Sequence, residues 1–240
     1  FQKQVAVKLL RHGSAQRFER ERQILAQLEH PHIARLLDGG AAADGTPYLV
    51  MEYVAGLPFD QYCAQQRLDV RARLRLFAAV CDAVEYAHGQ GVIHRDLKPG
   101  NILINAAGAP KLLDFGIAKL LDEAITDTRL SVTGAWLLTP DFASPEQVRG
   151  HAVTPASDVY SLGVLLYETL SGARPYQLAQ RSPAEIERVI CEQEPPAPSL
   201  AAINVGANAD DARQLRGALP ANEMVVLPPQ MLLDRIKSIL

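Results

Sequence analysis

The sequence predicts an α+β fold in which strands come first and long helices follow. Residues 4–10 and residues 48–54 are short runs rich in Val and Leu or aromatic residues, so both are predicted to be buried strands. Residues 70–90 place apolar side chains on one helical face and predict an amphipathic helix. Residues 158–168 are apolar nearly all round, which predicts a helix that is buried on every side.

Shorter elements are predicted between these four. Residues 15–29 carry apolar side chains at helical spacing, and residues 31–38 lead into another strand. Residues 102–104 and 111–113 flank a turn that contains Gly108, which predicts a hairpin. Residues 183–192 predict one more helix.

Composition places the chain among ordinary globular proteins. Its 240 residues are 48% hydrophobic and 21% charged, with a formal net charge of −3. No long basic run is present, so nucleic acid is not expected as a partner. No apolar run reaches the roughly 18 residues that a membrane helix needs, so no membrane segment is predicted in this chain. Three widely spaced cysteines without a metal-ligand pattern fit a cytoplasmic location.

Two short motifs indicate the chemistry. The first is His-Arg-Asp-Leu-Lys-Pro-Gly-Asn at residues 94–101, and the second is Leu-Asp-Phe-Gly at residues 113–116. Phosphoryl transfer needs a carboxylate beside the acceptor hydroxyl and oxygen ligands for Mg²⁺. Asp96 is predicted to accept the hydroxyl proton, and Lys98 to offset phosphate charge. Asn101 and Asp114 are predicted to hold Mg²⁺.

Either motif alone would also fit a turn with a capping aspartate. Both together, in this order and with Lys98 and Asn101 in register, favour phosphoryl transfer. At this point the chain closely resembles the protein kinase family. The stretch Ser-Pro-Glu-Gln at residues 144–147 is similar to that of bacterial, eukaryotic-like serine/threonine protein kinases.

The resemblance implies a two-lobed fold. Residues 1–53 would form a partial, small β-rich lobe, residues 54–56 the hinge, and residues 57–200 the larger, mostly helical lobe. Residues 201–240 match no family pattern and are expected to be a divergent C-terminal segment. The family's Gly-rich loop and its terminal helices are not recognisable, so the catalytic domain is expected to be incomplete at both ends.

The resemblance also assigns the residues that hold the phosphates. Lys8, in Val-Ala-Val-Lys, would pair with the α- and β-phosphates of ATP. Glu21, ten residues before Pro31, would pair with Lys8 and hold it toward the phosphates. Glu19 is the competing choice on a different helix face.

A second set of residues would bind the adenosine. Met51 takes the gatekeeper position, and the backbone groups of Glu52 and Val54 would contact the adenine edge. Gly56 would follow as the swivel of the hinge. Asp60 could reach the ribose hydroxyls.

Three residues, Phe115, His94 and Asp158, are expected to support the site without taking part in the reaction. Phe115 would pack between the lobes beside His94, which makes His94 a packing residue and not a base. Asp158, in the first turn of its helix, would accept backbone N–H groups of the catalytic loop. His88 is predicted to be a helix-end histidine and not a metal ligand.

Residues 114–146 resemble an activation segment rich in hydroxyl groups. Thr139 would help to shape the acceptor pocket, and Arg95 would receive a phosphate added to the segment. The candidate acceptors are Thr126, Thr128, Ser131 and Thr133.

The predicted function is that of a protein serine/threonine kinase, which uses ATP and Mg²⁺ to phosphorylate Ser or Thr of a protein substrate. Lys98 favours Ser/Thr acceptors over tyrosine. A truncated pseudokinase-like module that binds nucleotide or serves as a scaffold is the alternative.

Overall fold

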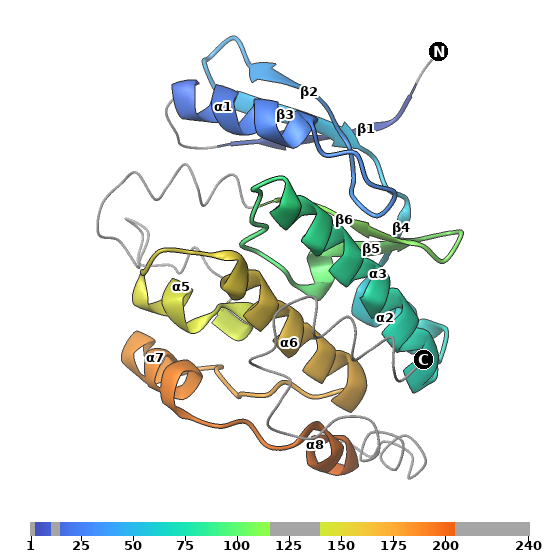
Figure 1. The fold of residues 1–240 in the computed structure, drawn as a ribbon, viewed down its shortest axis with the longest axis vertical. Coiled ribbons are helices and arrows are strands. Elements are labelled where there is room, and N and C mark those ends of the chain that lie inside the picture. Colours follow the sequence, from blue (N-terminus) through green and yellow to red (C-terminus); the bar gives the residue numbers. More distant parts are fainter. Residues whose placement is uncertain (1–2, 11–14, 116–139, 205–240) are drawn as a thin grey trace.

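Two groups of elements lie one above the other in the structure (Figure 1). A computed structural model describes residues 3–10, 15–115 and 140–204. A sheet with one helix forms the upper group, and several helices with a second small sheet form the lower one. The two-lobed α+β fold that the resemblance implied is therefore confirmed.

The upper lobe is built on three antiparallel strands. Strand β1 (Val5–Leu9) pairs with β3 (Pro47–Glu52), and β3 pairs on its other side with β2 (Leu36–Ala41). Helix α1 (Ala15–Ala26) packs against β2 and β3. The predicted strands and helix are confirmed here, but the prediction that residues 4–10 form a buried strand is wrong, because β1 has one exposed face.

Strand β1 has two different faces. Ala6 and Lys8 are half-buried, while the alternate side chains of Val5, Val7 and Leu9 are 41%, 59% and 64% exposed. Among the described residues β1 pairs with β3 alone, so it forms an edge of the sheet. The half-buried face is therefore the one that places Lys8 toward the lower lobe.

A second three-stranded sheet lies directly below the connection between the lobes. Strand β4 (Gly56–Pro58) pairs with β5 (Ile102–Asn105), which pairs with β6 (Pro110–Leu112). A Cβ atom at Gly56 would lie 2.4 Å from the carbonyl oxygen of Ile104. Because a backbone oxygen cannot give way to a side chain at that distance, this close approach requires glycine.

The lower lobe is organised around two helices that pack on each other. Helix α3 (Val70–Gly89) begins at Asp69, whose side chain accepts a hydrogen bond from the Ala72 amide at 2.7 Å. The turn after α3 passes through Gly91 at φ +73°, a left-handed conformation that glycine adopts readily after a helix. Helix α6 (Pro155–Ser171) is buried along most of its length and contacts α3.

The remaining helices are shorter. Helix α2 (Phe59–Gln65) follows β4, and α5 (Pro145–Arg149) precedes α6. Helix α7 (Pro183–Glu192) has the predicted bounds, and α8 (Pro198–Asn204) contacts α6. Two single-turn 3₁₀ helices, η1 (Pro99–Asn101) and η2 (Pro140–Phe142), complete the described elements of this lobe.

The main core lies between α3, α6 and the second sheet. Large side chains in it are less than 2% exposed, and each contributes about 1.5–3 kcal/mol by its burial. They include Phe59, Leu74, Phe77, Leu97, Ile102 and Leu162. Cys81 belongs to the same core. Leu97 lies within the catalytic motif, between Asp96 and Lys98. Because its side chain is buried in this core, it anchors the loop that carries these two residues.

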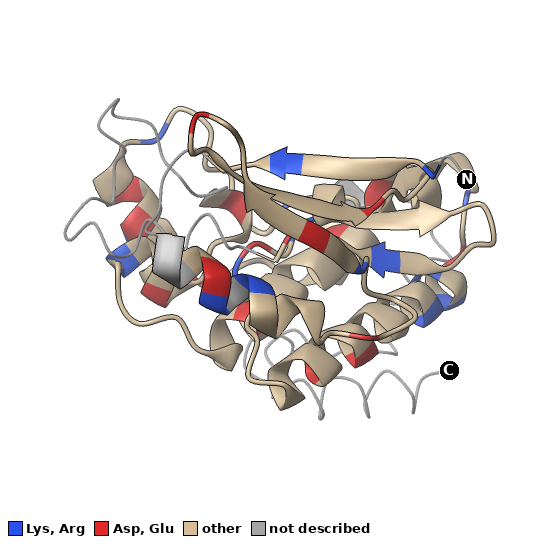
Figure 2. Ribbon diagram, turned by 90° about the horizontal axis from the view of Figure 1, so that it is seen from above, with Lys and Arg blue, Asp and Glu red and all other residues tan. Residues whose placement is uncertain are grey.

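Charged residues of both signs are interspersed along the ribbon when the molecule is seen from above (Figure 2). Within the described ranges, no helix combines the length and the apolar character that crossing a membrane requires.

Candidate active site

The catalytic motif brings three predicted residues into one cluster. The Nδ2 of Asn101 donates to Oδ2 of Asp96 at 2.9 Å and to the Asp96 carbonyl at 2.7 Å. The Nζ of Lys98 lies 2.9 Å from the same Oδ2. Helix η1 makes this possible because it turns the chain so that Asn101 returns to Asp96. The carboxylate is thereby held by an amide and by an ammonium group.

Lys8 and Asp114 meet across the two lobes. The Nζ of Lys8 lies 3.2 Å from Oδ1 of Asp114. That oxygen is buried and has no hydrogen-bond partner among the described residues, so the contact is an ion pair without hydrogen-bond geometry. Asp114 adopts φ +53°, a left-handed conformation that is uncommon outside glycine. Backbone strain of this kind is concentrated at functional sites.

The donor set around Asp114 fits a magnesium ion. Asn101 and Asp114 are the two predicted metal ligands. They come together because Leu113, the residue before Asp114, donates its amide N–H to the Asn101 carbonyl at 2.8 Å. Both hydrogen bonds of the Asn101 amide nitrogen go to Asp96, so Oδ1 of Asn101 is the atom that would face a metal. The Asp114 oxygen without a hydrogen-bond partner among the described residues would be a second hard ligand.

No group of three or more His, Cys, Asp or Glu side chains that would hold a metal by itself occurs among the described residues. A magnesium site of one or two carboxylate or amide ligands completed by phosphate oxygens matches this arrangement.

A pocket opens between the sheet of the upper lobe and Asp114. Lys8 and Asp114 line its polar side. Met51, Leu25 and Phe115 are among the apolar residues that line the rest. The predicted gatekeeper therefore lies on the same pocket as the predicted phosphate-binding lysine and metal-binding aspartate. Phe115 lies here between the lobes, as predicted, and Leu25 lines the same pocket.

The connection between the lobes holds Glu52 in a defined position. Its Oε2 lies 3.1 Å from the Lys111 Nζ on β6, and it accepts the Arg35 amide at 3.2 Å. Burial acts to raise the pKa of Glu52, but the hydrogen bonds from Lys111 and Arg35 and the Lys111 charge outweigh it, so the pKa lies below its usual value. The Glu52 amide donates to the Arg35 carbonyl, which leaves the carbonyl as the Glu52 group that could contact adenine.

For Val54 and Asp60, the other residues predicted to contact adenosine, the structure gives only their location and exposure. Val54 is half-buried between β3 and β4. Asp60 is exposed in the first turn of α2. Their contacts with a nucleotide stay predictions.

The prediction for Glu21 lies outside what the structure describes. Its backbone belongs to α1, but its side chain is not among the described ones. The competing residue, Glu19, pairs with Arg22 at 2.6 Å. The described partner of Lys8 is Asp114, so the pairing of Lys8 with Glu21 stays a prediction.

His94 is a packing residue, as predicted. It is 1% exposed, and its ring lies 4.8 Å from the ring of Phe115. Its Nε2 lies 2.8 Å from the Leu113 carbonyl and must donate to it, which leaves Nδ1 as the acceptor for the Asp96 amide at 3.3 Å. With both ring nitrogens engaged in structural contacts, His94 does not act as the base.

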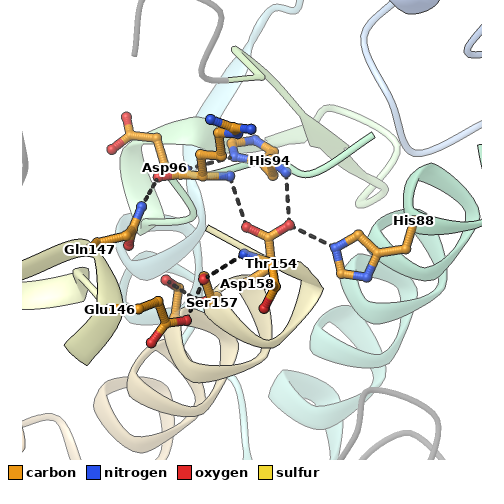
Figure 3. Close-up of polar contacts among 10 residues, drawn as sticks. His88, His94, Asp96, Glu146, Gln147, Thr154, Ser157 and Asp158 are labelled. Atoms are coloured by element: carbon orange, nitrogen blue, oxygen red, sulfur yellow. Dashed lines mark hydrogen bonds and ion pairs between the residues drawn. The ribbon is translucent and has the colours of Figure 1, made fainter. Parts of the chain in front are cut away.

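Asp158 anchors the catalytic loop, as predicted. Its Oδ2 accepts the His94 amide at 2.7 Å, and its Oδ1 accepts the Arg95 amide at 2.8 Å (Figure 3). Between these contacts Arg95 adopts φ +68°, a conformation that costs an arginine about 1–3 kcal/mol. The Arg95 carbonyl accepts a hydrogen bond from the Gln147 side chain at 2.9 Å. Three contacts thus hold the strained residue next to Asp96.

Two supporting residues were missed by the sequence analysis. Gln147 belongs to a capping box with Ser144 at the start of α5, and the spacing Ser-x-x-Gln could have indicated it. His88 lies 2.7 Å from Asp158 through its Nε2. No local pattern could have indicated that contact, since the two residues are 70 positions apart.

Part of the predicted activation segment lies outside the described residues, which leave out 116–139. The predictions made there concern Thr126, Thr128, Ser131, Thr133 and Thr139. At the described end of this segment, Glu146 accepts a hydrogen bond from the Ser157 hydroxyl, whose oxygen in turn accepts the Thr154 amide at 3.2 Å (Figure 3).

Comparisons with known proteins agree with this geometry. The protein kinase domain model matches residues 1–213. The chain is 40% identical over 218 residues to the serine/threonine-protein kinase PknB of Mycobacterium tuberculosis, covering 86% of this chain and 34% of that protein. It is 39% identical over 186 residues to the serine/threonine-protein kinase pkn3 of Myxococcus xanthus, covering 73% of this chain and 34% of the relative.

The serine/threonine-protein kinase PknA of Mycobacterium tuberculosis is 42% identical over 185 residues, which covers 72% of this chain and 42% of PknA. The chain thus spans about a third of the length of PknB and pkn3. The family model covers well over half of the chain. The chain belongs to the protein kinase family.

Proposed function

We propose that the protein transfers the γ-phosphoryl group of ATP to Ser or Thr hydroxyl groups of proteins. The observation that carries the proposal is the placement of the Asp96, Lys98 and Asn101 cluster beside an Asp114 that is already paired with Lys8. The Leu113–Asn101 hydrogen bond joins the two groups. The names of the relatives, all serine/threonine-protein kinases, support the same activity.

Lys8, Asn101 and Asp114 would hold the nucleotide and its metal. Lys8 offers an ammonium group to the α- and β-phosphates, and Asn101 and Asp114 offer oxygen ligands. When bound, Mg²⁺ neutralises the charge that develops on the phosphoryl oxygens. The Glu52 carbonyl, the Val54 backbone and Asp60 would bind the adenosine, and Glu21 would support Lys8.

Asp96 would receive the proton of the acceptor hydroxyl. A general base must be an acceptor placed within hydrogen-bond reach of the proton it takes. The Asn101 and Lys98 contacts fix one oxygen of Asp96, so its carboxylate has a defined direction. The ammonium group of Lys98 lies beside the Asp96 carboxylate, where it would offset negative charge on the phosphoryl group.

The partners are then ATP and a protein substrate with a Ser or Thr acceptor. A cytoplasmic location is part of the proposal, because ATP must be available to the site. Nucleic acid is not proposed as a partner.

Radiolabelled ATP tests the proposal directly. The purified protein is incubated with [γ-³²P]ATP, Mg²⁺ and a generic acceptor protein, and the labelled amino acids are separated after hydrolysis. We expect label on phosphoserine and phosphothreonine, and none when Mg²⁺ is chelated. Nucleotide binding without any transfer would instead favour the pseudokinase-like module.

The Asp114→Asn variant tests the metal role. Asparagine tolerates the left-handed backbone of this position, so the substitution removes charge without new strain. We expect calorimetric nucleotide binding to lose most of its dependence on Mg²⁺. The same Mg²⁺ dependence in variant and wild type would contradict the assignment. Asp44→Asn, at an exposed turn, is the matched control.

A further inference from the structure

The side-chain amide of Gln147 joins the start of helix α5 to the catalytic loop (Figure 3). Its Oε1 accepts the Ser144 amide at 3.0 Å, and its Nε2 donates to the Arg95 carbonyl at 2.9 Å. The first contact closes the capping box of α5, and the second reaches a residue 52 positions earlier in the chain. One side chain therefore contacts a helix cap through its oxygen and the residue before Asp96 through its nitrogen.

The two partners fix which end of the amide faces which group. The Ser144 N–H can only donate a hydrogen bond, and the Arg95 carbonyl can only accept one. Turning the amide over would place Nε2 against an N–H and Oε1 against a carbonyl, and both hydrogen bonds would be lost. This position therefore uses the acceptor and the donor of the amide at the same time.

Helix α7 begins with the same capping box on the exposed surface, but with a glutamate. There Oε2 of Glu185 accepts the Ser182 amide at 2.8 Å, and the Glu185 amide lies 3.4 Å from the Ser182 hydroxyl oxygen. The corresponding distances in α5 are 3.0 and 3.4 Å. A carboxylate thus closes this box in the same chain, and it also complements the helix dipole. What a carboxylate lacks is the N–H that Gln147 donates to Arg95.

The capping box of α5 is anchored in the protein interior. Ser144 is 0% exposed, and η2 lies directly before it in the chain. The Phe142 carbonyl, at the end of η2, accepts a hydrogen bond from the Ser161 hydroxyl of α6 at 2.8 Å. The oxygen side of the Gln147 amide is therefore attached to a part of the lower lobe that is itself fixed to α6.

This part of the chain is also the described end of the predicted activation segment. Thr139, which is expected to help shape the acceptor pocket, directly precedes η2. On the other side of the amide, the Arg95 carbonyl belongs to the peptide that leads into Asp96. Gln147 therefore connects the segment expected to receive the acceptor with the loop that carries the proposed base.

The connection acts on the direction of the Asp96 carboxylate. Arg95 is held at φ +68°, and the Gln147 donor fixes the plane of the peptide that follows it. Without this donor the peptide is free to turn about its flanking bonds, and the Asp96 side chain turns with it. A small error in the direction of a reacting group lowers the rate even when the substrate still binds.

We propose that Gln147 is a positioning residue for phosphoryl transfer, whose Nε2–H sets the peptide before Asp96 from the acceptor side of the site. The catalytic part of this inference rests on the function proposed above for Asp96. Its structural part, the hydrogen bond to the Arg95 carbonyl, can be measured without any activity.

Three variants test the proposal. Gln147→Glu keeps the oxygen that closes the capping box and replaces the donor by a second oxygen. Gln147→Met has a side chain of similar length and removes both the acceptor and the donor. Glu185→Gln is the matched control, because it exchanges the same two groups at the same position of the exposed α7 box.

The first readout is the carbonyl ¹³C resonance of Arg95 in isotopically labelled protein. Loss of a hydrogen-bond donor moves a carbonyl resonance to lower frequency. We expect this shift in Gln147→Glu and in Gln147→Met, and a wild-type resonance in Glu185→Gln. The melting temperature of Gln147→Glu should stay close to that of wild type, because the capping box remains. An Arg95 resonance at its wild-type position in both Gln147 variants would overturn the proposal.

The second readout separates kcat from KM. We expect Gln147→Glu to lower kcat by about tenfold to 10²-fold with little change in KM for ATP, while Glu185→Gln keeps the wild-type kcat. If Gln147 served only as a helix cap, Gln147→Glu would keep kcat and Gln147→Met alone would be impaired, and this result would also overturn the proposal. A wild-type protein that transfers no phosphate would refute the proposed function, and the Arg95 resonance would still decide whether Gln147 holds this carbonyl.

Discussion

The ammonium group of Lys8 lies 3.2 Å from the Asp114 carboxylate, and this contact joins the two lobes at the proposed nucleotide site. Each residue has a separate proposed ligand, the phosphates for Lys8 and the metal for Asp114. Each side chain is about a third exposed, at 30% and 34%, so solvent screens their attraction. The pair therefore keeps both charges in the cleft without holding them tightly, which allows ligands to replace it.

The Lys8→Met variant should show that the two charges act on each other. We expect phosphoryl transfer to be lost, because the phosphates lose their cation. Mg²⁺ alone should bind more tightly than to wild type, since Asp114 no longer has a positive neighbour. Calorimetric titration with Mg²⁺ in the absence of nucleotide measures this. Lys8→Arg keeps the charge and should bind Mg²⁺ like wild type; equal Mg²⁺ affinity in all three proteins would contradict the coupling.

Asp96→Asn should abolish transfer while ATP still binds. The carboxylate is proposed to serve the acceptor hydroxyl and not the nucleotide, and loss of a general base typically costs about 10²–10⁴-fold in rate. Transfer of label to a generic protein acceptor gives the rate, and calorimetry gives ATP affinity. Asp44→Asn serves again as the control. Turnover at the wild-type rate in Asp96→Asn would remove Asp96 from its role.

The ion pair between Glu52 and Lys111 should make stability depend on pH. The pKa of Glu52 in the folded protein is depressed below 4.5, so its contribution is complete above that value and is lost as the pH falls through the folded-state pKa. We expect Glu52→Gln to lower the free energy of unfolding at neutral pH by about 1 kcal/mol. Below pH 4.5 the difference between variant and wild type should shrink.

Urea unfolding at the two pH values measures this difference. Glu29→Gln is a suitable control, because Glu29 forms its ion pair with Arg35 at the surface, where the two side chains are 70% and 61% exposed. Its removal should leave stability unchanged at either pH. A difference between Glu52→Gln and wild type that persisted in acid would show that the effect does not come from the ionised carboxylate.

The activation segment should be autophosphorylated. We expect phosphate on one or more of its hydroxyl residues, first of all Thr133 or Thr128, with Arg95 as the receiver. Mass spectrometry after incubation with ATP locates the phosphate. Arg95→Asn is the appropriate variant, because asparagine tolerates φ +68° and isolates the loss of charge. Full activity with no phosphate between residues 126 and 133 would exclude this form of regulation.

The sequence predicted those helices and strands in which the apolar residues themselves follow a recognisable pattern. Helices α3 and α6 and strands β1 and β3 are long enough, or apolar enough, for the pattern alone to indicate them. Strand β4 has three residues, and its pairing partner β5 comes more than forty positions later, so no local pattern marks it. Helices α2, α5 and α8 have seven residues or fewer, which is too short for helical periodicity to be distinguished.

The same limit applies to the candidate site. The motifs indicated Asp96, Lys98, Asn101 and Asp114 because their spacing along the chain is fixed by local turns. The contact of His88 with Asp158 depends on how α3 packs against α6, which no short stretch encodes. The left-handed backbone of Arg95 is likewise held by a long-range contact with Asp158, which the residue type does not indicate.

Strand β1 has a consequence for work with the isolated chain. Its outward side chains, Val5, Val7 and Leu9, are among the most exposed large apolar groups of the described residues, and they lie on a strand at the edge of its sheet. A strand with an apolar face and an open edge can add a strand from another molecule. Light scattering of the 240-residue chain should therefore show association that increases with concentration, and Val7→Lys, which places a charge in the middle of this strand, should suppress it.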